Sequence, residues 1–252
     1  MIADTELSIL ASGLLRQNLF PPATSLQKIL DFVASQLPLW RDRHDRPFAE
    51  AEDELTDQLC AHLLSASRHH GFDFLQFRRE TRDKVKGSRK HDLVIAPNSA
   101  VIEVEGRRHT EFDILFPLEC KRLPTPAGRD RDEREYVFSS KKSTGGVQRF
   151  KAGHHASDHR VAGMIAYVQQ SDIASWSSRV TDWIDGLLQD RVAGWTSTDH
   201  LVETLQDTRL RIGQFRSTHG REKKLEPITL HHFWIELDAP VATVSEIAPA
   251  SQ

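Results

Sequence analysis

The segment Phe116-Pro117-Leu118-Glu119-Cys120-Lys121-Arg122-Leu123 carries the pattern on which our predictions of fold and function depend. Interpreted as a β-strand, it places Glu119 and Lys121 on one face and Cys120 on the other, because successive strand side chains point to opposite faces. A carboxylate and an ammonium that share a face can hold a divalent cation and stabilise a developing negative charge. Such pairs also occur on ordinary exposed strands, so the interpretation depends on what surrounds this one in the chain.

The composition is typical of a soluble globular protein. Of the 252 residues, 38% are hydrophobic and 27% are charged, enough for a substantial core. The sequence has no apolar run of about twenty residues. Its residues 1–6 include acidic side chains and no basic leader, so we expect neither a membrane span nor a secretory signal. The two cysteines, Cys60 and Cys120, lack metal-ligand spacing and are expected as reduced thiols in a cytoplasmic protein.

Charge is unevenly distributed along the chain. The net charge of −3 argues against a protein that coats nucleic acid non-specifically. Residues 78–91 and 141–151 are nevertheless rich in lysine and arginine. Local positive fields of this kind can bind phosphates, although solvated loop charges are the alternative interpretation. The candidate nucleic-acid contacts are Arg89, Lys90, Lys142 and Arg149.

Apolar residues recur at helical spacing near the N-terminus. Two consecutive prolines divide this region into two helices, and Thr24 or Ser25 is a suitable N-cap for the second. We interpret residues 1–45 as a helical extension that packs on the main domain or on a partner. Residues 46–240 form the main domain, and residues 241–252 a flexible tail.

The main domain alternates between helical and strand patterns. An amphipathic helix is expected over residues 48–70, ended by Gly71, and a turn over residues 107–111. The expected strands cover residues 72–80, 90–96, 100–105, 114–123, 161–168 and 229–237, with a further short strand at 210–215. Helices are expected before His154 and after an Asp172 cap. This alternation predicts an α/β fold.

Two carboxylates stand at positions that need an explanation. Glu52 lies at the N-terminal end of the buried stripe of the 48–70 helix, where it can also simply complement the helix dipole. Asp92 begins a strand just before an apolar run. Aspartate is depleted from strand interiors, so we expect Asp92 either at a sheet edge or held by a partner such as a metal ion.

Polar side chains of these kinds follow one another in a distinctive order of elements: Glu52 on a helix, Asp92 at the start of a strand, Glu119-Cys120-Lys121 on a later strand and Gln148 on the next helix. This order resembles the PD-(D/E)XK nuclease superfamily, over about half of the chain. The resemblance implies a restriction-endonuclease-like core, in which helices flank a mixed central sheet. The elements expected over residues 48–168 follow the order of that core, with one extra strand near Ala100.

The resemblance also implies a role for each position. Asp92 and Glu119 would bind Mg²⁺ or Mn²⁺ with the backbone carbonyl of Cys120, because hard oxygen ligands suit these ions. Glu52 would complete the metal shell, often through water. Lys121 would orient or help deprotonate the attacking water and balance charge in the transition state.

Some positions depart from the superfamily pattern or leave it open. Gln148 resembles a helix glutamine that positions the motif or contacts the backbone, but Ala152 stands where the RecB-like branch has a tyrosine. Glu103 and Glu105 are alternative acidic candidates in the gap before Glu119, although no lysine follows them at the required place.

Three function classes remain open from the sequence. The resemblance implies a metal-dependent nuclease that hydrolyses DNA in restriction, repair or anti-phage defence, as a homodimer or with a partner ATPase or defence subunit, and without a membrane. The second class is a catalytically silent subunit for nucleic-acid binding or assembly. The third is an unrelated α/β domain, whose acidic residues would lie well over ~10 Å apart instead of sharing an ion.

Overall fold

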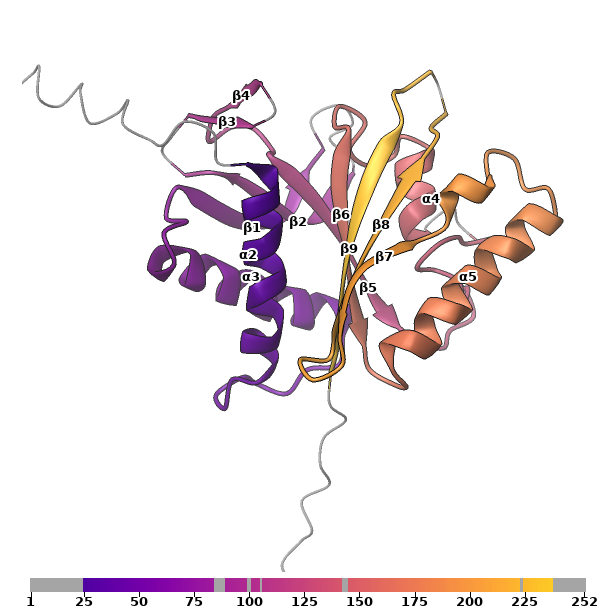
Figure 1. Ribbon diagram of the computed structural model, residues 1–252, viewed down its shortest axis with the longest axis horizontal. Helices are drawn as coiled ribbons and strands as arrows, with labels where there is room; N and C mark the ends of the chain where they lie inside the picture. The colour runs from indigo at the N-terminus through magenta and orange to yellow at the C-terminus, as the bar shows by residue number, and fades with distance from the viewer. Residues whose placement is uncertain are drawn as a thin grey trace, which may run out of the picture.

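The computed structural model describes residues 25–83, 89–98, 101–104, 106–141, 145–222 and 224–237. Its main feature is a seven-stranded sheet in the order β1-β2-β5-β6-β9-β8-β7 (Figure 1). The strands of this sheet are β1 (Leu75–Arg82), β2 (Lys90–Pro97), β5 (Phe116–Leu123), β6 (Val161–Val168), β7 (Val202–Asp207), β8 (Ile212–His219) and β9 (Ile228–Glu236). A separate two-stranded sheet contains β3 (Ile102–Val104) and β4 (Arg107–His109).

The large sheet is mixed. β6 pairs in parallel with β5 and with β9, and the other neighbouring strands pair antiparallel. The apolar run of β6 is explained by this central place, since a strand covered on both faces needs apolar side chains on both. The predicted α/β fold, with a mixed sheet flanked by helices, is therefore observed.

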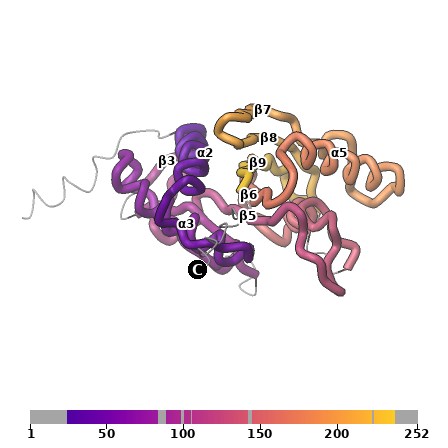
Figure 2. The backbone as a smooth tube through the Cα atoms, turned by 90° about the horizontal axis from the view of Figure 1, so that it is seen from below, coloured from indigo at the N-terminus to yellow at the C-terminus, as the bar shows by residue number. Residues whose placement is uncertain are grey.

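Helices cover both faces of the sheet. The helices are α2 (Leu26–Arg41), α3 (Glu52–His69), α4 (Gly146–Lys151) and α5 (Ile173–Gln189), with a 3₁₀ turn η2 (Ser197–Asp199). Side chains of α2 and α3 share one hydrophobic cluster with the sheet, and those of α4 and α5 share the other. Figure 2 shows α2 and α3 on one side of the central strands and α5 on the other. None of the described helices combines the length and apolar character needed to cross a membrane.

Helix α2 begins as the sequence predicts and extends further. The Ser25 side chain caps it by accepting a hydrogen bond from the Lys28 amide. The helix continues through Trp40, only 1% exposed, because that indole packs into the same cluster as α3. The Arg41 guanidinium donates to the carbonyl of Leu210 at 2.8 Å, which attaches α2 to the β7–β8 connection. Residues 1–24 and 238–252, including the expected tail, lie outside the described residues.

The sheet margins differ from the sequence prediction. We expect a turn at residues 107–111, but residues 107–109 form β4, which pairs with β3. Residues 202–207 form the edge strand β7, for which the sequence predicts no element. Most side chains of β7 are exposed, so its sequence lacks the alternation that reveals a strand with one buried face.

Candidate active site

β2 and β5 part at the point where the candidate site lies. Their backbone ladder ends at the pair Leu93 and Leu118. Beyond it, the Asp92 carboxylate accepts a hydrogen bond from the Cys120 amide at 2.9 Å, in place of a backbone partner. β2 lies between β1 and β5, so Asp92 is not on an edge strand. Of the two expectations for Asp92, the structure shows a partner, and that partner is a backbone amide.

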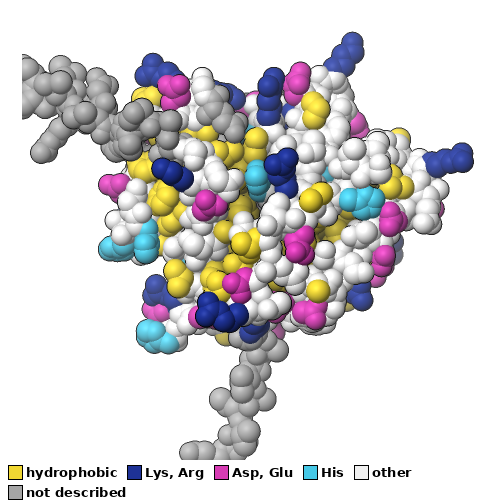
Figure 3. Space-filling view, in the orientation of Figure 1, with side chains coloured by type: hydrophobic (Ala, Val, Ile, Leu, Met, Phe, Trp, Pro, Cys, Tyr) yellow, Lys and Arg dark blue, Asp and Glu magenta, His cyan; other side chains and the backbone are white. Residues whose placement is uncertain are grey.

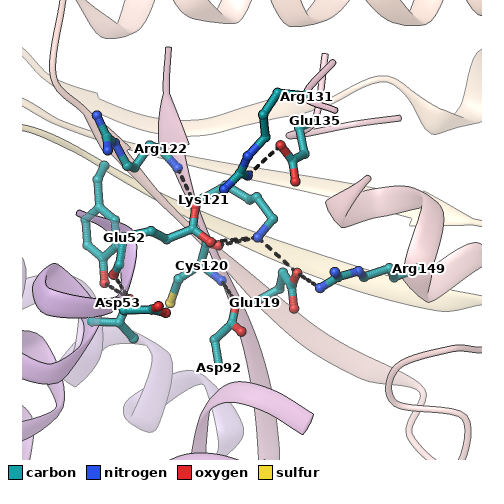
Figure 4. A network of polar contacts seen from close by, with 12 residues as sticks. Glu52, Asp53, Asp92, Glu119, Cys120, Lys121, Arg122, Arg131, Glu135 and Arg149 are labelled. Atoms are coloured by element: carbon teal, nitrogen blue, oxygen red, sulfur yellow. Dashed lines mark hydrogen bonds and ion pairs between the residues drawn. The ribbon is translucent and has the colours of Figure 1, made fainter. Parts of the chain in front are cut away.

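Lys121 lies at the centre of the converging charges (Figure 4). Its Nζ is 2.9 Å from Glu52 Oε1, 3.2 Å from Glu119 Oε1 and 2.8 Å from the carbonyl oxygen of Cys120. The second oxygen of Glu52 accepts a hydrogen bond from the Arg122 amide at 3.2 Å. Because Glu52 is the first residue of α3, this contact brings the N-terminus of that helix to the end of β5.

Glu119 is completely buried and carries a negative charge. Burial alone would raise the pKa of this carboxyl, but Lys121, His155 and Arg149 hold it well below its usual range. Arg149 from α4 contacts Glu119 Oε1 at 2.5 Å, and His155 Nδ1 lies 3.2 Å from Oε2. The His155 contact is not aligned as a hydrogen bond, so Glu119 Oε2 has no hydrogen-bond partner among the described residues.

Asp92 has the opposite electrostatic environment. Burial, and then the nearby charge of Glu119, raise the pKa of Asp92 to about 7, although Lys121 acts against the shift. Burial also works against the charge of Lys121, but Glu119, Glu52 and Asp92 raise the pKa of Lys121 above its usual value. Lys121 is therefore an ammonium at neutral pH. Two neighbouring carboxyls with widely separated pKa values are a feature of acid–base sites.

Two histidines that no sequence motif predicts lie near Glu119. His155 follows α4, and its ring lies 5.2 Å from that of His91 in an edge-to-face arrangement. Burial lowers the pKa of His91 to about 4, so its imidazole is neutral, with Nε2 3.5 Å from Asp83. Neither histidine is predicted from the sequence, because neither stands at a spacing from the acidic residues that would indicate a common site.

The other candidate residues differ in how near they lie to Glu119 and Lys121. The Gln148 amide oxygen accepts hydrogen bonds from the backbone amides of Ser139 and Gly145, so this side chain fixes the turn before α4. Its neighbour Arg149, expected to contact nucleic acid, is the α4 side chain that meets Glu119. Glu103 is exposed on the separate β3–β4 sheet, whereas Glu105 lies outside the described residues.

Of the remaining basic candidates, two lie at or just before the start of β2 and one lies outside the described residues. Lys90 forms an exposed ion pair with Glu80, and Arg89 donates to the carbonyl of Gly153. Lys142 lies outside the described residues. Figure 3 shows lysine and arginine side chains interspersed with acidic ones on the visible face, so the described residues form no continuous basic surface there.

Glu52, Asp92, Glu119 and Lys121, here called the carboxylate–lysine cluster, come from α3, β2 and β5. The contacts that link them to each other and to the Cys120 backbone lie between 2.8 and 3.2 Å. The hypothesis of unrelated surface acids requires wide separation, and the short contacts contradict it. What the convergence leaves open is whether the cluster binds a metal ion.

The suitability of the cluster for a divalent cation can be judged from its donor atoms. Among the described residues, no three His, Cys, Asp or Glu side chains form a ready-made metal-binding group. The Lys121 ammonium contacts both Glu52 and Glu119, so a cation would have to share or displace that contact. The donors fit in chemical type, since they are hard oxygens and Glu119 Oε2 is buried without a hydrogen bond.

A second polar group, here called the buried chain, crosses the other face of the sheet. Its members form consecutive hydrogen bonds of 2.5 to 2.8 Å and are Trp234, Tyr136, His232, Ser217, His219, Asp199 and Lys151. Trp234 can only donate to Tyr136, so the Tyr136 hydroxyl must donate to His232 Nδ1. The same direction then runs through Ser217 to Asp199. Burial lowers the pKa of both His219 and His232, which agrees with two neutral imidazoles.

Part of the buried chain has the connectivity of a Ser-His-Asp triad. Ser217 Oγ is 2.6 Å from His219 Nε2, and His219 Nδ1 is 2.6 Å from Asp199. All three residues are at most 3% exposed, whereas the carboxylate–lysine cluster reaches solvent at Glu52, whose side chain is 26% exposed. Ser217 also serves as acceptor for His232. We therefore interpret the chain as structural: it connects β8 and β9 to α4 through Lys151.

Comparisons of this protein with protein-family models, with curated proteins and with solved structures give no match. A function therefore has to be inferred from the chemistry of the carboxylate–lysine cluster and from the order of its residues in the chain.

Proposed function

We propose that the protein is a metal-dependent nuclease of the PD-(D/E)XK type that hydrolyses phosphodiester bonds in DNA. The observation that carries the proposal is the convergence of Glu52, Asp92, Glu119 and Lys121 where β2 and β5 part. Carboxylates and a protonated lysine are the groups that a site needs to hold a cation and to stabilise a phosphorane-like transition state. The order of these residues along the chain is the one by which the sequence resembles that superfamily.

Asp92, Glu119 and the Cys120 carbonyl would hold Mg²⁺ or Mn²⁺, and Glu52 would complete the metal shell, often through water. The ion would acidify a water molecule and neutralise phosphate oxygens. The contribution of Glu119 depends on its charge, which Lys121 and Arg149 preserve in a fully buried position. Arg149 is thus proposed as a positioning residue for Glu119.

Lys121 acts as a cation in this proposal. Its raised pKa keeps it protonated, which favours stabilisation of negative charge on the phosphate over removal of a proton from water. Its hydrogen bond to the Cys120 carbonyl, at 2.8 Å, fixes the ammonium beside a proposed metal ligand. A neutral residue of similar size would keep the packing and lose this charge.

The experiment is cleavage of plasmid, linear and single-stranded DNA in Mg²⁺, Mn²⁺ or EDTA by the native protein and by Lys121→Gln. Lys28→Gln is the matched control, because Lys28 is an exposed lysine on α2, outside the two segments rich in lysine and arginine. We expect metal-dependent cleavage that falls about 10²–10³-fold in Lys121→Gln, the usual effect of losing one transition-state contact. Lys28→Gln should cleave within a few-fold of the native rate, and circular dichroism would check that both variants fold.

The alternative function is a catalytically silent subunit that binds nucleic acid or assembles with a partner. It predicts that no DNA form is cut and that DNA binding is the same in Mg²⁺ and in EDTA. Cleavage that continues at the native rate in Lys121→Gln would exclude the carboxylate–lysine cluster as the active site.

A further inference from the structure

A cavity of about 410 Å³ lies beside α4. Its lining includes Phe138, Gln148, Lys151, Val192, Trp195 and Arg221. Arg149, between Gln148 and Lys151, instead contacts Glu119 of the carboxylate–lysine cluster. Helical residues two positions apart point in nearly opposite directions, so α4 presents one face to the cluster and another to the cavity.

Aromatic rings form one wall of this cavity. The rings of Trp195 and Phe138 meet edge to face, with centroids 6.4 Å apart. The Lys151 Nζ lies 4.8 Å from the centre of the Trp195 ring, in a cation–π contact. Lys151 is itself fixed by Asp199 at 2.5 Å, at the end of the buried chain. The wall is therefore built on a rigid base, while both rings remain partly exposed.

Three of the residues that line the cavity are small. Ala193, Gly194 and Gly220 all belong to its lining. A Cβ atom built at Gly194 or at Gly220 would meet nothing within 4 Å. At these two glycines the lining therefore consists of backbone with open space beside it.

The polar groups around the cavity suit a heteroaromatic ring with mixed donors and acceptors. The Arg221 guanidinium is partly exposed and is held by the carbonyls of Ala156 and Glu226. Glu222 contributes an exposed carboxylate to the same lining. A nucleobase carries both donors and acceptors on its edges and has a face that stacks on aromatic side chains.

We propose that this cavity binds an unpaired nucleobase of the strand held at the carboxylate–lysine cluster. This inference rests on the proposed function, which supplies the DNA strand bound at the cluster. An α-helix with its side chains is about 10–12 Å across, so a strand that ran from Glu119 around α4 would reach the far side of this helix within a few nucleotides. A base in a duplex is stacked and paired, so the cavity selects single strands, flaps and unpaired ends.

The test is the binding of a fluorescein-labelled single-stranded oligonucleotide in EDTA, measured by anisotropy. The variant Trp195→Leu keeps apolar volume and removes the aromatic face, and Trp195→Phe retains a ring. Phe112→Ala is the control, because Phe112 is an aromatic residue outside the cavity and is 77% exposed. We expect about tenfold weaker binding for Trp195→Leu, the effect of losing one base stack, and near-native binding for the other two variants. An oligonucleotide made of abasic units should bind the native protein and Trp195→Leu equally.

The outcomes separate this inference from the proposed function. One outcome is metal-dependent cleavage together with equal binding and equal single-strand preference in the native protein and Trp195→Leu. It would contradict base binding in the cavity and leave the proposed nuclease activity supported. Weaker oligonucleotide binding by Trp195→Leu in a protein that cuts no DNA would support base binding in the cavity and contradict the proposed nuclease activity. An equal loss of binding to the intact and the abasic strand would overturn the cavity, since it would indicate a change that does not involve bases.

Discussion

The Asp92 carboxylate and the Cys120 backbone amide form a 2.9 Å hydrogen bond just beyond the end of the β2–β5 ladder. This bond fixes Asp92 near Glu119, where burial and the charge of Glu119 raise its pKa to about 7. The fold thus places the Asp92 carboxyl where burial and the charge of Glu119 oppose its ionisation. Such an arrangement weakens the folded state at neutral pH and is retained in proteins where the charge has a function.

Asp92→Asn is expected to stabilise the protein and to abolish cleavage. The folded-state pKa is raised, so the folded protein holds a proton that the unfolded chain releases, and stability falls as pH rises from about 4 to 7. Asparagine keeps an acceptor for Cys120 and removes the charge. We expect urea unfolding to show a gain of about 1–3 kcal/mol at pH 8 and little gain at pH 4.

The exposed Asp73→Asn is the control for this comparison and should leave the unfolding free energy at pH 8 within about 0.5 kcal/mol of native. If Asp92→Asn were less stable than the native protein at pH 8, the ionised carboxylate would be favourable in the fold and the interpretation of Asp92 would be wrong.

Arg149→Met is expected to destabilise the protein in the absence of DNA. The Arg149 guanidinium contacts the fully buried Glu119 carboxylate at 2.5 Å, and its removal leaves Lys121 as the remaining ion-pair partner of Oε1. Loss of a hydrogen bond to a buried charge costs about 1.5–3 kcal/mol. Chemical denaturation measures this loss, and the exposed Lys141→Met is the control. An arginine that only contacted DNA phosphates would give no change without DNA.

The difference between Gln148 and Arg149 shows how far sequence reasoning reaches at this site. Strand alternation predicts correctly that Glu119 and Lys121 share a face, because the period of two is independent of tertiary context. Helix α4 has only six residues, too few to define a buried stripe, so the sequence cannot tell which of its side chains meets the strand. The contact depends on the turn that Gln148 fixes.

Other parts of the site and fold are set by contacts between distant segments. His155 lies in the irregular segment after α4, where no periodicity predicts a direction. β7 is polar because it is an edge strand, and its strand character comes from pairing with β8. By contrast, the limits of β6 follow from its sequence, since an uninterrupted apolar run of eight residues suits a strand covered on both faces.

The histidines of the buried chain are expected to make stability depend on acid pH. Burial holds the pKa of His232 well below that of an exposed histidine. As pH falls below about 6.5, the unfolded chain binds protons that the folded protein excludes, so the free energy of unfolding decreases. Glutamine can accept from Tyr136 and donate to Ser217 without titrating, so His232→Gln should preserve the chain.

Urea unfolding between pH 4.5 and 5.5 measures this effect. For His232→Gln the slope of the unfolding free energy against pH should be smaller than in the native protein by about 1.4 kcal/mol per pH unit, which is one proton. The exposed His44→Gln should keep the native slope. An unchanged slope in His232→Gln would mean that His232 is protonated in the folded state.

The ion pair of Lys151 and Asp199 is the connection between the buried chain and α4, and its energetic importance follows from burial alone. Lys151 and Asp199 are 2.5 Å apart with side chains at most 7% exposed, whereas Arg43 and Asp45 are 2.6 Å apart with both about half exposed. Asp199→Asn leaves a buried ammonium without its carboxylate and should cost about 3–5 kcal/mol. Asp45→Asn breaks an exposed pair of nearly the same length and should cost much less than Asp199→Asn, because water replaces the partner. If the double variant Lys151→Met/Asp199→Asn were as unstable as the sum of its single variants, the two side chains would not act as a pair, and the attachment of α4 would have to be sought in its apolar contacts.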